Sequence, residues 1–434
     1  MIADKRQKFL ALFISEILIL LVVGVAMAYV LPANNFPLGR EVLEQAGNFC
    51  MNLSLIQIFL YFIYWYFYHK AYKGFGYAFT HARMMNKLRR MLLEASTKHT
   101  TQEYAGDEVV ARLPKIKIIL EDDLKSGTVI LGNSIRYHKL FEDMNISSAL
   151  GSYVVLEQYI SDDMNEYVYN FEKRSEKNMK FKSYDDFKKY SQVYEDYTLF
   201  IDEKNSVPLH HTLIVGATGS GKTYATYSLL LQMLNFSTRP EIYIADPKQS
   251  SLYVLGKKIA CDNTAGVTGE IVVLLQRFYN QMLLREKEMQ QHLMKKLDSD
   301  FKDWNLPAHV FVIDEFSSFQ SVINTHDKAT KDKVNMYLTN IIQKGRQLGF
   351  YMIIIMQKSD SKILPTYLRD NLVFKVVLGQ ATDTTYQTAF EEYADLPKLN
   401  FSAGQGLYSY QGLTRQPKVC SFPALQFDIL QSVY

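Results

Sequence analysis

Cysteine is scarce in this chain, and the few that occur show no pattern. Cys50, Cys261 and Cys420 are the three cysteines among 434 residues, and none lies close to another. This spacing excludes a disulfide framework and does not match a zinc site. The sequence has no internal repeats, which excludes a repeat architecture. It also has no long tract rich in proline or glutamine.

A strong excess of one charge is missing as well. The chain has 48 basic and 45 acidic residues, so its formal net charge is only +3. A strongly basic nucleic-acid protein would stand out more, so contact with nucleic acid would rest on local patches or on several subunits together. Apolar residues, in contrast, make up 48% of the chain, which is typical of a protein with membrane segments. The length predicts two or three structural units.

Two long apolar runs lie within the first seventy residues, at about 9–31 and 50–68. At a rise of 1.5 Å per residue, the first run spans a hydrocarbon core of about 30 Å. The second ends in a cluster of aromatic residues, which favour the membrane–water interface. We therefore predict two transmembrane helices. Glu16, inside the first, either reaches water or is protonated, or it makes a polar contact between subunits.

The basic residues around these runs predict their orientation. Lys5, Arg6 and Lys8 precede the first run, a larger basic cluster follows the second, and Arg40 is the single basic residue between them. The positive-inside rule places both termini in the cytoplasm and the short loop outside. In the competing interpretation, Ala26-Met27-Ala28 is the cleavage site of a signal peptide, and the bulk of the chain still stays cytoplasmic.

The amino-acid pattern changes twice in the rest of the chain. Residues 69–104 are basic and helix-prone, and they predict a juxtamembrane helix. Residues 105–205 contain short β-rich runs and predict a small α/β domain. In 206–434, short apolar runs alternate with helical segments, which indicates a parallel sheet covered on both faces. The predicted fold class is therefore α/β.

The strongest chemical signal is GATGSGKT, between a predicted strand and a predicted helix. It matches the P-loop pattern, in which backbone N–H groups and a helix N-terminus surround the phosphates of ATP. We expect Lys222 to contact the β- and γ-phosphates and Thr223 to bind Mg²⁺. The predicted nucleotide-binding residues are Gly216, Ala217, Thr218, Gly219, Ser220, Gly221, Lys222 and Thr223.

Polar residues follow three further predicted strands. After HVFVI, Asp314 is expected to bind Mg²⁺, and Glu315 to deprotonate the attacking water. After the strand 351–356, Gln357 is either a sensor of the γ-phosphate or a cap of the strand end. The segment 246–248, with the sequence DPK, is a turn or part of the site.

In their order and spacing, GATGSGKT, DPK, VIDEF, KGRQLGFYMIIIMQK and LPTYLRDNLVFKV resemble the FtsK/SpoIIIE family of DNA translocases, over roughly residues 206–420. The resemblance implies a RecA-like motor domain that forms hexamers around DNA and contacts it independently of sequence. It also implies that Lys222, Glu315 and Gln357 act in ATP hydrolysis. Arg346 and Arg369 are the two candidates for an arginine donated to the ATP of a neighbour, with Arg369 favoured, and the alternative is that either is a salt-bridged surface residue.

The short layout with two helices looks like the TcpA-type coupling proteins of conjugative elements in Gram-positive bacteria. That similarity implies a cell-membrane protein that receives DNA from a relaxase and passes it to channel proteins. A chromosome-partitioning motor and a type VII-like protein-export ATPase are the alternatives. The segment 402–405 resembles the signature of ABC transporters, but it follows the acidic strand instead of preceding it, which argues against that class.

Overall fold

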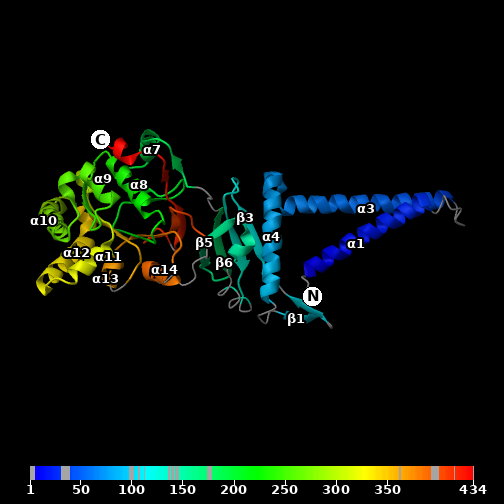
Figure 1. Cartoon of the computed structure of the whole chain (residues 1–434). Coiled ribbons are helices and arrows are strands. Elements are labelled where there is room, and N and C mark those ends of the chain that lie inside the picture. Colours follow the sequence, from blue (N-terminus) through cyan, green and yellow to red (C-terminus); the bar gives the residue numbers. More distant parts are fainter. Residues whose placement is uncertain are drawn as a thin grey trace. The chain divides into compact units, whose positions relative to one another are not determined.

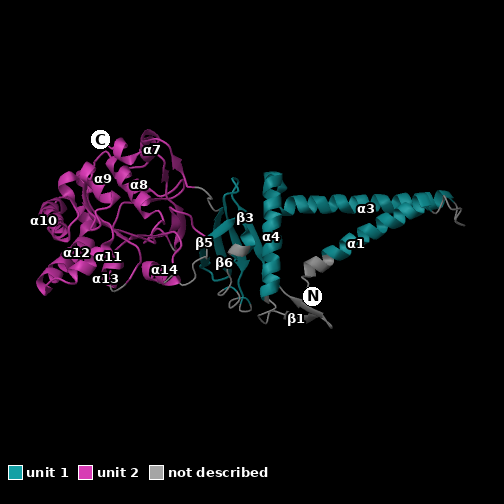
Figure 2. Ribbon diagram, in the orientation of Figure 1, with its two compact units in different colours: residues 1–174 teal, residues 175–434 magenta. Residues whose placement is uncertain are grey.

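The computed structural model describes residues 5–30, 40–96, 102–105, 108–111, 113–134, 137, 141, 146–173, 178–360, 363–391, 400–414 and 416–433. The chain forms two compact units, residues 1–174 and 175–434 (Figure 2). Helices and strands are mixed in both, which confirms the α/β fold class (Figure 1). Residues 31–39 of the loop predicted to lie outside the membrane, and the side chains of Lys5, Arg6 and Lys8, fall outside the described residues, whereas residues 40–49 of that loop belong to a helix.

Unit 1 begins with two long apolar helices. Helix α1 (Lys5–Val25) continues into a π-helical turn, η1 (Ala26–Val30), and α3 (Arg40–Tyr68) follows. The segments Leu10–Val30 and Arg40–Tyr68 are long and apolar enough to cross a membrane. Helix α3 begins ahead of the predicted apolar run, because residues 40–49 contain no proline to interrupt the helix.

The remainder of unit 1 is a sheet with a helix packed on it. A short turn, η2 (Ala71–Lys73), leads into α4 (Phe75–Ser96), which buries Leu88 and Leu92 in the core that it shares with the sheet. The sheet is antiparallel, in the order β3-β4-β6-β5, and its strands lie in the segment 105–205, where β-rich runs were expected. The strands are β3 (Ile116–Leu120), β4 (Ser126–Gly132), β5 (Tyr153–Ile160) and β6 (Glu166–Lys173). Helix α6 (Ser147–Leu150) packs in the same core. A separate pair of strands is formed by β1 (Gln102–Ala105) and β2 (Glu108–Ala111).

An eight-stranded sheet in the order β12-β11-β13-β14-β10-β15-β16-β17 forms the centre of unit 2. Every pair from β12 to β15 is parallel, as predicted, and β16 and β17 extend the sheet in the antiparallel sense. The bounds are β10 (Thr212–Gly216), β11 (Glu241–Ala245), β12 (Thr264–Ala265), β13 (His309–Ile313), β14 (Phe350–Met356), β15 (Phe374–Leu378), β16 (Gln405–Tyr410) and β17 (Lys418–Ser421).

Helices cover both faces of this sheet, so its central strands are buried throughout. On β10, Ile214 packs in one core with α8 (Lys222–Leu234) and α9 (Ser251–Ile259). Leu213 and Val215 point to the other face, whose core contains side chains from five helices. Those helices are α10 (Thr268–Leu293), α11 (Phe316–Ile323), α12 (Lys328–Leu348), α13 (Thr366–Arg369) and α14 (Asp383–Phe390).

Both ends of unit 2 belong to its core. Strand β7 (Lys180–Phe181) near the start pairs with β18 (Ala424–Leu425) near the end. Phe181, Phe187 and Phe200 lie in the same core as α8. The unit thus begins earlier in the chain than the alternation of strands and helices does. Its remaining elements are α7 (Tyr184–Ser191), β8 (Thr198–Phe200), β9 (Ser206–Pro208), the short helical turns η3 (Cys261–Asn263) and η4 (Lys302–Trp304), and α15 (Ile429–Ser432).

Candidate functional site

Apart from the two candidate arginines, the predicted site residues meet where four neighbouring parallel strands end. Strands β11, β13, β14 and β10 are adjacent in the sheet, and their carboxyl ends lie at one edge. Asp246, Asp314 and Gln357 directly follow β11, β13 and β14, and the nucleotide loop follows β10. Ligands of open parallel sheets bind at such an edge.

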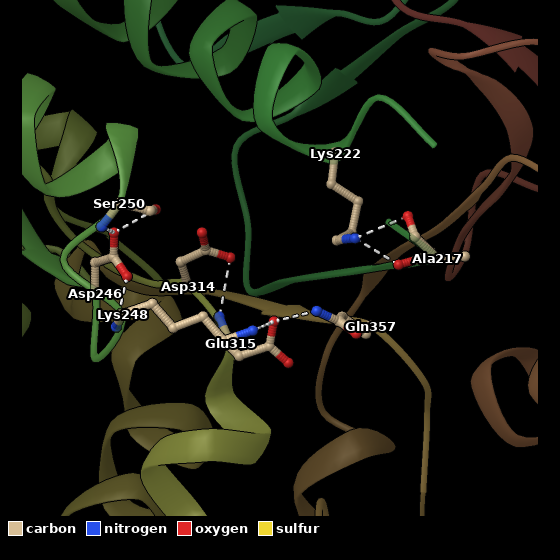
Figure 3. A network of polar contacts seen from close by, with 9 residues as sticks. Ala217, Lys222, Asp246, Lys248, Ser250, Asp314, Glu315 and Gln357 are labelled. Carbon is tan, nitrogen blue, oxygen red and sulfur yellow. Dashed lines mark hydrogen bonds and ion pairs between the residues drawn. The ribbon is translucent and has the colours of Figure 1, made fainter. Parts of the chain in front are cut away.

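The loop after β10 has the backbone of a phosphate-binding turn. Gly219 and Gly221 have φ values of 81° and 96°, which side chains rarely permit, and α8 begins immediately afterwards. The Lys222 ammonium group donates to the carbonyl oxygens of Gly216 and Ala217 (Figure 3). Burial lowers the pKa of Lys222. The buried Ser220 hydroxyl has no hydrogen-bond partner among the described residues, so the loop retains polar capacity for a ligand.

Asp314 is partly buried next to a second carboxylate, that of Asp246. Burial is the main reason, and the Asp246 carboxylate the second, that the pKa of Asp314 rises to about 6. One of its oxygens accepts the backbone N–H of Glu315 at 2.9 Å. A nearby cation would relieve the repulsion that raises this pKa.

Glu315 is held at the centre of the site. Its backbone has φ 48° and ψ 52°, a left-handed conformation that is uncommon outside glycine. The residue is 9% exposed, and its Oε2 atom accepts hydrogen bonds from Lys248 Nζ and Gln357 Nε2, each at 2.9 Å (Figure 3). Lys248, Glu315 and Gln357, which follow strands β11, β13 and β14, are therefore joined by hydrogen bonds to one carboxylate oxygen. Gln357 is more than a strand-end cap, because its amide binds the predicted catalytic acid.

The DPK segment belongs to this site. Asp246 is fully buried and organises the turn, since its Oδ2 atom accepts from the backbone and the hydroxyl of Ser250 at 2.7 and 2.6 Å. Its Oδ1 atom accepts from the backbone of Lys248 at 3.0 Å. The turn thereby directs Lys248 towards Glu315. The sequence pattern indicated this segment without assigning a role to Lys248.

Mg²⁺ fits the donors that are present. Among the described residues, no group of three His, Cys, Asp or Glu side chains is arranged to hold a metal by itself. Magnesium, however, is commonly bound by one or two carboxylates together with substrate phosphates. Asp314 and the exposed Thr223 hydroxyl are the protein groups that would hold it, and the ion would offset phosphate charge there.

The nucleotide loop is also held by a contact with residues 403–404, which the sequence did not reveal. The Gly404 N–H donates to the Ser220 carbonyl at 2.8 Å, and a Cβ atom on Gly221 would lie 2.3 Å from Gly404 N. Asn178 in turn donates to the carbonyl oxygen of Ala403 at 3.1 Å and accepts from the Ser421 hydroxyl at 2.9 Å. The segment that resembles an ABC signature is thus a support of the loop in its own subunit.

The two candidate arginines lie away from this edge. Arg346 is exposed in the last turn of α12, just before β14 begins. Arg369 is 6% exposed and lies 3.5 Å from Glu391, which also pairs with Lys375 near the start of β15. A strand of five residues spans about 16 Å. Both arginines are therefore separated from the nucleotide loop of their own subunit by the length of the sheet.

No protein-family model matches the chain. The FtsK domain-containing protein YdcQ of Bacillus subtilis is 28% identical over 186 residues, which are 42% of this chain and 37% of that protein. The DNA translocase FtsK of Caldanaerobacter subterraneus is 23% identical over 195 residues, 42% of this chain and 25% of that protein. The chain therefore spans well under half the length of these relatives.

Two solved structures are similar to parts of this chain. The pCW3 conjugation coupling protein TcpA superposes on 79% of this chain and 96% of its own, with a TM-score of 0.48 and 16% identity. The cytoplasmic domain of the type VII secretion ATPase EccC of Thermomonospora curvata covers 55% of this chain and 30% of its own, with a TM-score of 0.38 and 18% identity. The chain is thus similar in sequence to FtsK-domain proteins, and it has the glycine-rich loop, the acidic strand end and a glutamine that contacts it, as expected of a P-loop ATPase of this kind.

Proposed function

We propose that the protein is a membrane-anchored, ATP-driven DNA translocase that acts as a coupling protein in conjugative transfer. The observation that carries the proposal is the convergence of Lys248, Glu315 and Gln357 beside the nucleotide loop. A carboxylate held in this way is suited to orient and deprotonate a water molecule for attack on the terminal phosphate.

Each residue of the site has one task in this proposal. Backbone N–H groups of 216–223 bind the phosphates, and Lys222 exchanges two carbonyl partners for phosphate oxygens. Glu315 takes the proton of the attacking water. Gln357, hydrogen-bonded to Glu315, is placed to respond when the terminal phosphate leaves. Asp314 and Thr223 hold the metal ion.

The active site would be completed by a second subunit. Charge that develops on the transferred phosphate is commonly offset by an arginine, and neither candidate is near the nucleotide loop of its own subunit. Moving Arg369 outwards would break its ion pair with Glu391 and withdraw a side chain that is now buried. Arg346 is exposed and needs no such rearrangement, so we favour it as the residue donated to the neighbour's ATP in a hexameric ring.

The DNA substrate, the membrane and the conjugative role rest on similarity and composition. Relatives of this chain include DNA translocases, and one structural neighbour is a conjugation coupling protein. The two apolar helices near the N-terminus suit a membrane anchor with both termini in the cytoplasm. A relaxase and channel proteins would be the partners at the two ends of the DNA path.

ATPase activity of the full-length protein in detergent, with single-stranded DNA, duplex DNA or neither, tests this function. We expect stimulation by DNA that weakens as salt is raised, because phosphate contacts release counterions. Hydrolysis that DNA leaves unchanged would contradict the translocase. Extraction of membranes at alkaline pH tests the anchor separately, and release of the protein would contradict it.

A further inference from the structure

A cavity of about 680 Å³ lies within unit 1, between α1, α3 and α4. Its apolar wall includes Leu10 and Phe13 of α1 and Tyr61 and Trp65 of α3. Its polar side is formed by α4, which contributes Arg89 and Arg90. The cavity thus combines an aliphatic and aromatic wall with two cationic groups.

The packing of the two long helices explains why space exists there. Far from α4 the helices are in close contact, since a Cβ atom on Gly47 would lie 2.5 Å from Ala28 N and 2.7 Å from Gly24 O. Towards α4 they diverge, as Figure 1 shows. Phe13 and Tyr61, at the divergent end, still contact one another with ring centroids 6.3 Å apart. Bulky rings therefore line the space without filling it.

The arginines of the cavity are poorly satisfied by the protein. The Nη2 atom of Arg89 donates to the Tyr68 hydroxyl at 3.4 Å, a long contact, and its buried Nε atom has no hydrogen-bond partner among the described residues. Arg90 is exposed. No ion pair between described residues includes either arginine. A buried guanidinium N–H without an acceptor is costly, so the site favours an anionic ligand.

We propose that this cavity binds an anionic phospholipid, with the head-group phosphate on Arg89 and Arg90 and an acyl chain against Leu10, Phe13 and Trp65. Aromatic side chains of this kind prefer the level of the head groups, and basic residues next to a membrane helix attract anionic lipid. The cavity opens between segments that suit a membrane span, so lipid is the ligand at hand. The proposal rests on the membrane anchoring proposed above.

Trp65 offers a direct probe, because the chain has two tryptophans and the other, Trp304, lies in unit 2. In a Trp304→Phe background, the full-length protein is placed in phosphatidylcholine nanodiscs. A small fraction of the lipid is brominated phosphatidylglycerol or, in parallel, brominated phosphatidylcholine. We expect the anionic label to quench Trp65 at about five- to thirtyfold lower mole fraction, since each basic residue contributes roughly fivefold.

Two double variants of equal charge separate the site from the general surface. Arg89→Gln with Arg90→Gln removes the cationic groups of the cavity, and it should abolish the preference for the anionic label. Arg83→Gln with Lys87→Gln changes exposed residues of the same helix outside the cavity, and it should retain the preference. Free glycerol phosphate in excess should not restore fluorescence, which distinguishes a lipid from a soluble phosphate.

Three results would overturn the proposal. Equal quenching by the two labels would show that the cavity does not select charge. Equal loss of the preference in both double variants would assign it to the surface potential. In the third result, a small fraction of brominated phosphatidylglycerol does not quench Trp65, although nanodiscs made only of brominated phosphatidylcholine do. That result would show that the cavity is filled by protein and does not admit a lipid. If that uniform label fails as well, the anchoring itself is wrong, whereas DNA-stimulated ATPase activity would be unaffected.

Discussion

The Nζ atom of Lys248 lies 2.9 Å from the Oε2 atom of Glu315, and Gln357 donates to that same oxygen at the same distance. The two donors come from the ends of strands β11 and β14, on either side of the strand that carries Glu315. The position of the proposed catalytic base is thus fixed from both sides.

Removal of one of these restraints should slow hydrolysis without weakening nucleotide binding. We expect Lys248→Ala to lower kcat about ten- to a hundredfold, because a displacement of the base by 1 Å can cost roughly a hundredfold. Steady-state ATPase assays and binding of a fluorescent ATP analogue measure the two effects. Lys287→Ala, on the exposed face of α10, is the matched control. Equal loss in both variants, or loss of binding in Lys248→Ala, would argue against a positioning role.

Glu315 and Lys222 should fail in different ways. Glu315→Gln keeps a side chain of the same size but removes the base, so we expect ATP to bind normally and kcat to fall by about 10²–10⁴. Lys222→Ala removes the ammonium group that meets the phosphates, so binding should be lost as well. Normal turnover by Glu315→Gln would assign the base to another residue.

A shared active site predicts that two inactive variants rescue each other. Arg346→Ala subunits retain an intact nucleotide site, and Lys222→Ala subunits retain the donated arginine. We expect neither variant alone to hydrolyse ATP appreciably, since an arginine of this kind contributes about 10³-fold or more. In mixed rings, activity should reappear with a maximum near equal proportions. If mixed rings assemble but ATPase activity does not recover, Arg346 is not the arginine donated to the neighbour's ATP.

The acid stability of unit 2 should depend on His211. Burial lowers the pKa of His211 to about 3 and that of His210 to about 4, and the Nδ1 atom of His211 accepts the Met352 N–H at 3.1 Å. The unfolded chain binds these protons near pH 6.5, so stability should fall as pH drops from about 6.5 towards 4.

Urea unfolding in detergent, followed by Trp304 fluorescence in a Trp65→Phe background, measures this dependence. His211→Asn keeps an acceptor for Met352 and removes the titrating ring, so we expect the decline with falling pH to become shallower. His326→Asn, at an exposed position, should leave the slope unchanged. If the free energy of unfolding of His211→Asn falls with pH as steeply as before, His211 is not a cause of the acid sensitivity.

Short apolar runs predicted the central strands closely. The strands expected at 309–313 and 351–356 agree with β13 and β14 to within one residue, because buried parallel strands are short, continuous apolar runs. The P-loop and the acidic strand end were predicted for a similar reason, since their chemistry requires fixed residue types at fixed spacing. The four antiparallel strands of unit 1 were also visible as β-rich runs.

Other features left no local trace in the sequence. The residues from Met179 to Phe200 join the core of unit 2. Tyr184, Phe187 and Tyr190 have helical spacing, but nothing local in the sequence assigns this helix to unit 2. The pairing of Lys248 with Glu315 joins residues 67 positions apart, so it depends on the order of strands in the sheet. The two candidate arginines differ in burial, which follows from tertiary packing alone.

The first and last strands of unit 2 are neighbours, because β7 pairs with β18, and Asn178 ties the entry of the unit to the turn behind the nucleotide loop. The Ala403–Gly404 turn in turn contacts the nucleotide loop, because the Gly404 N–H donates to the Ser220 carbonyl. The entry of unit 2 is therefore linked to the nucleotide loop by two successive hydrogen bonds.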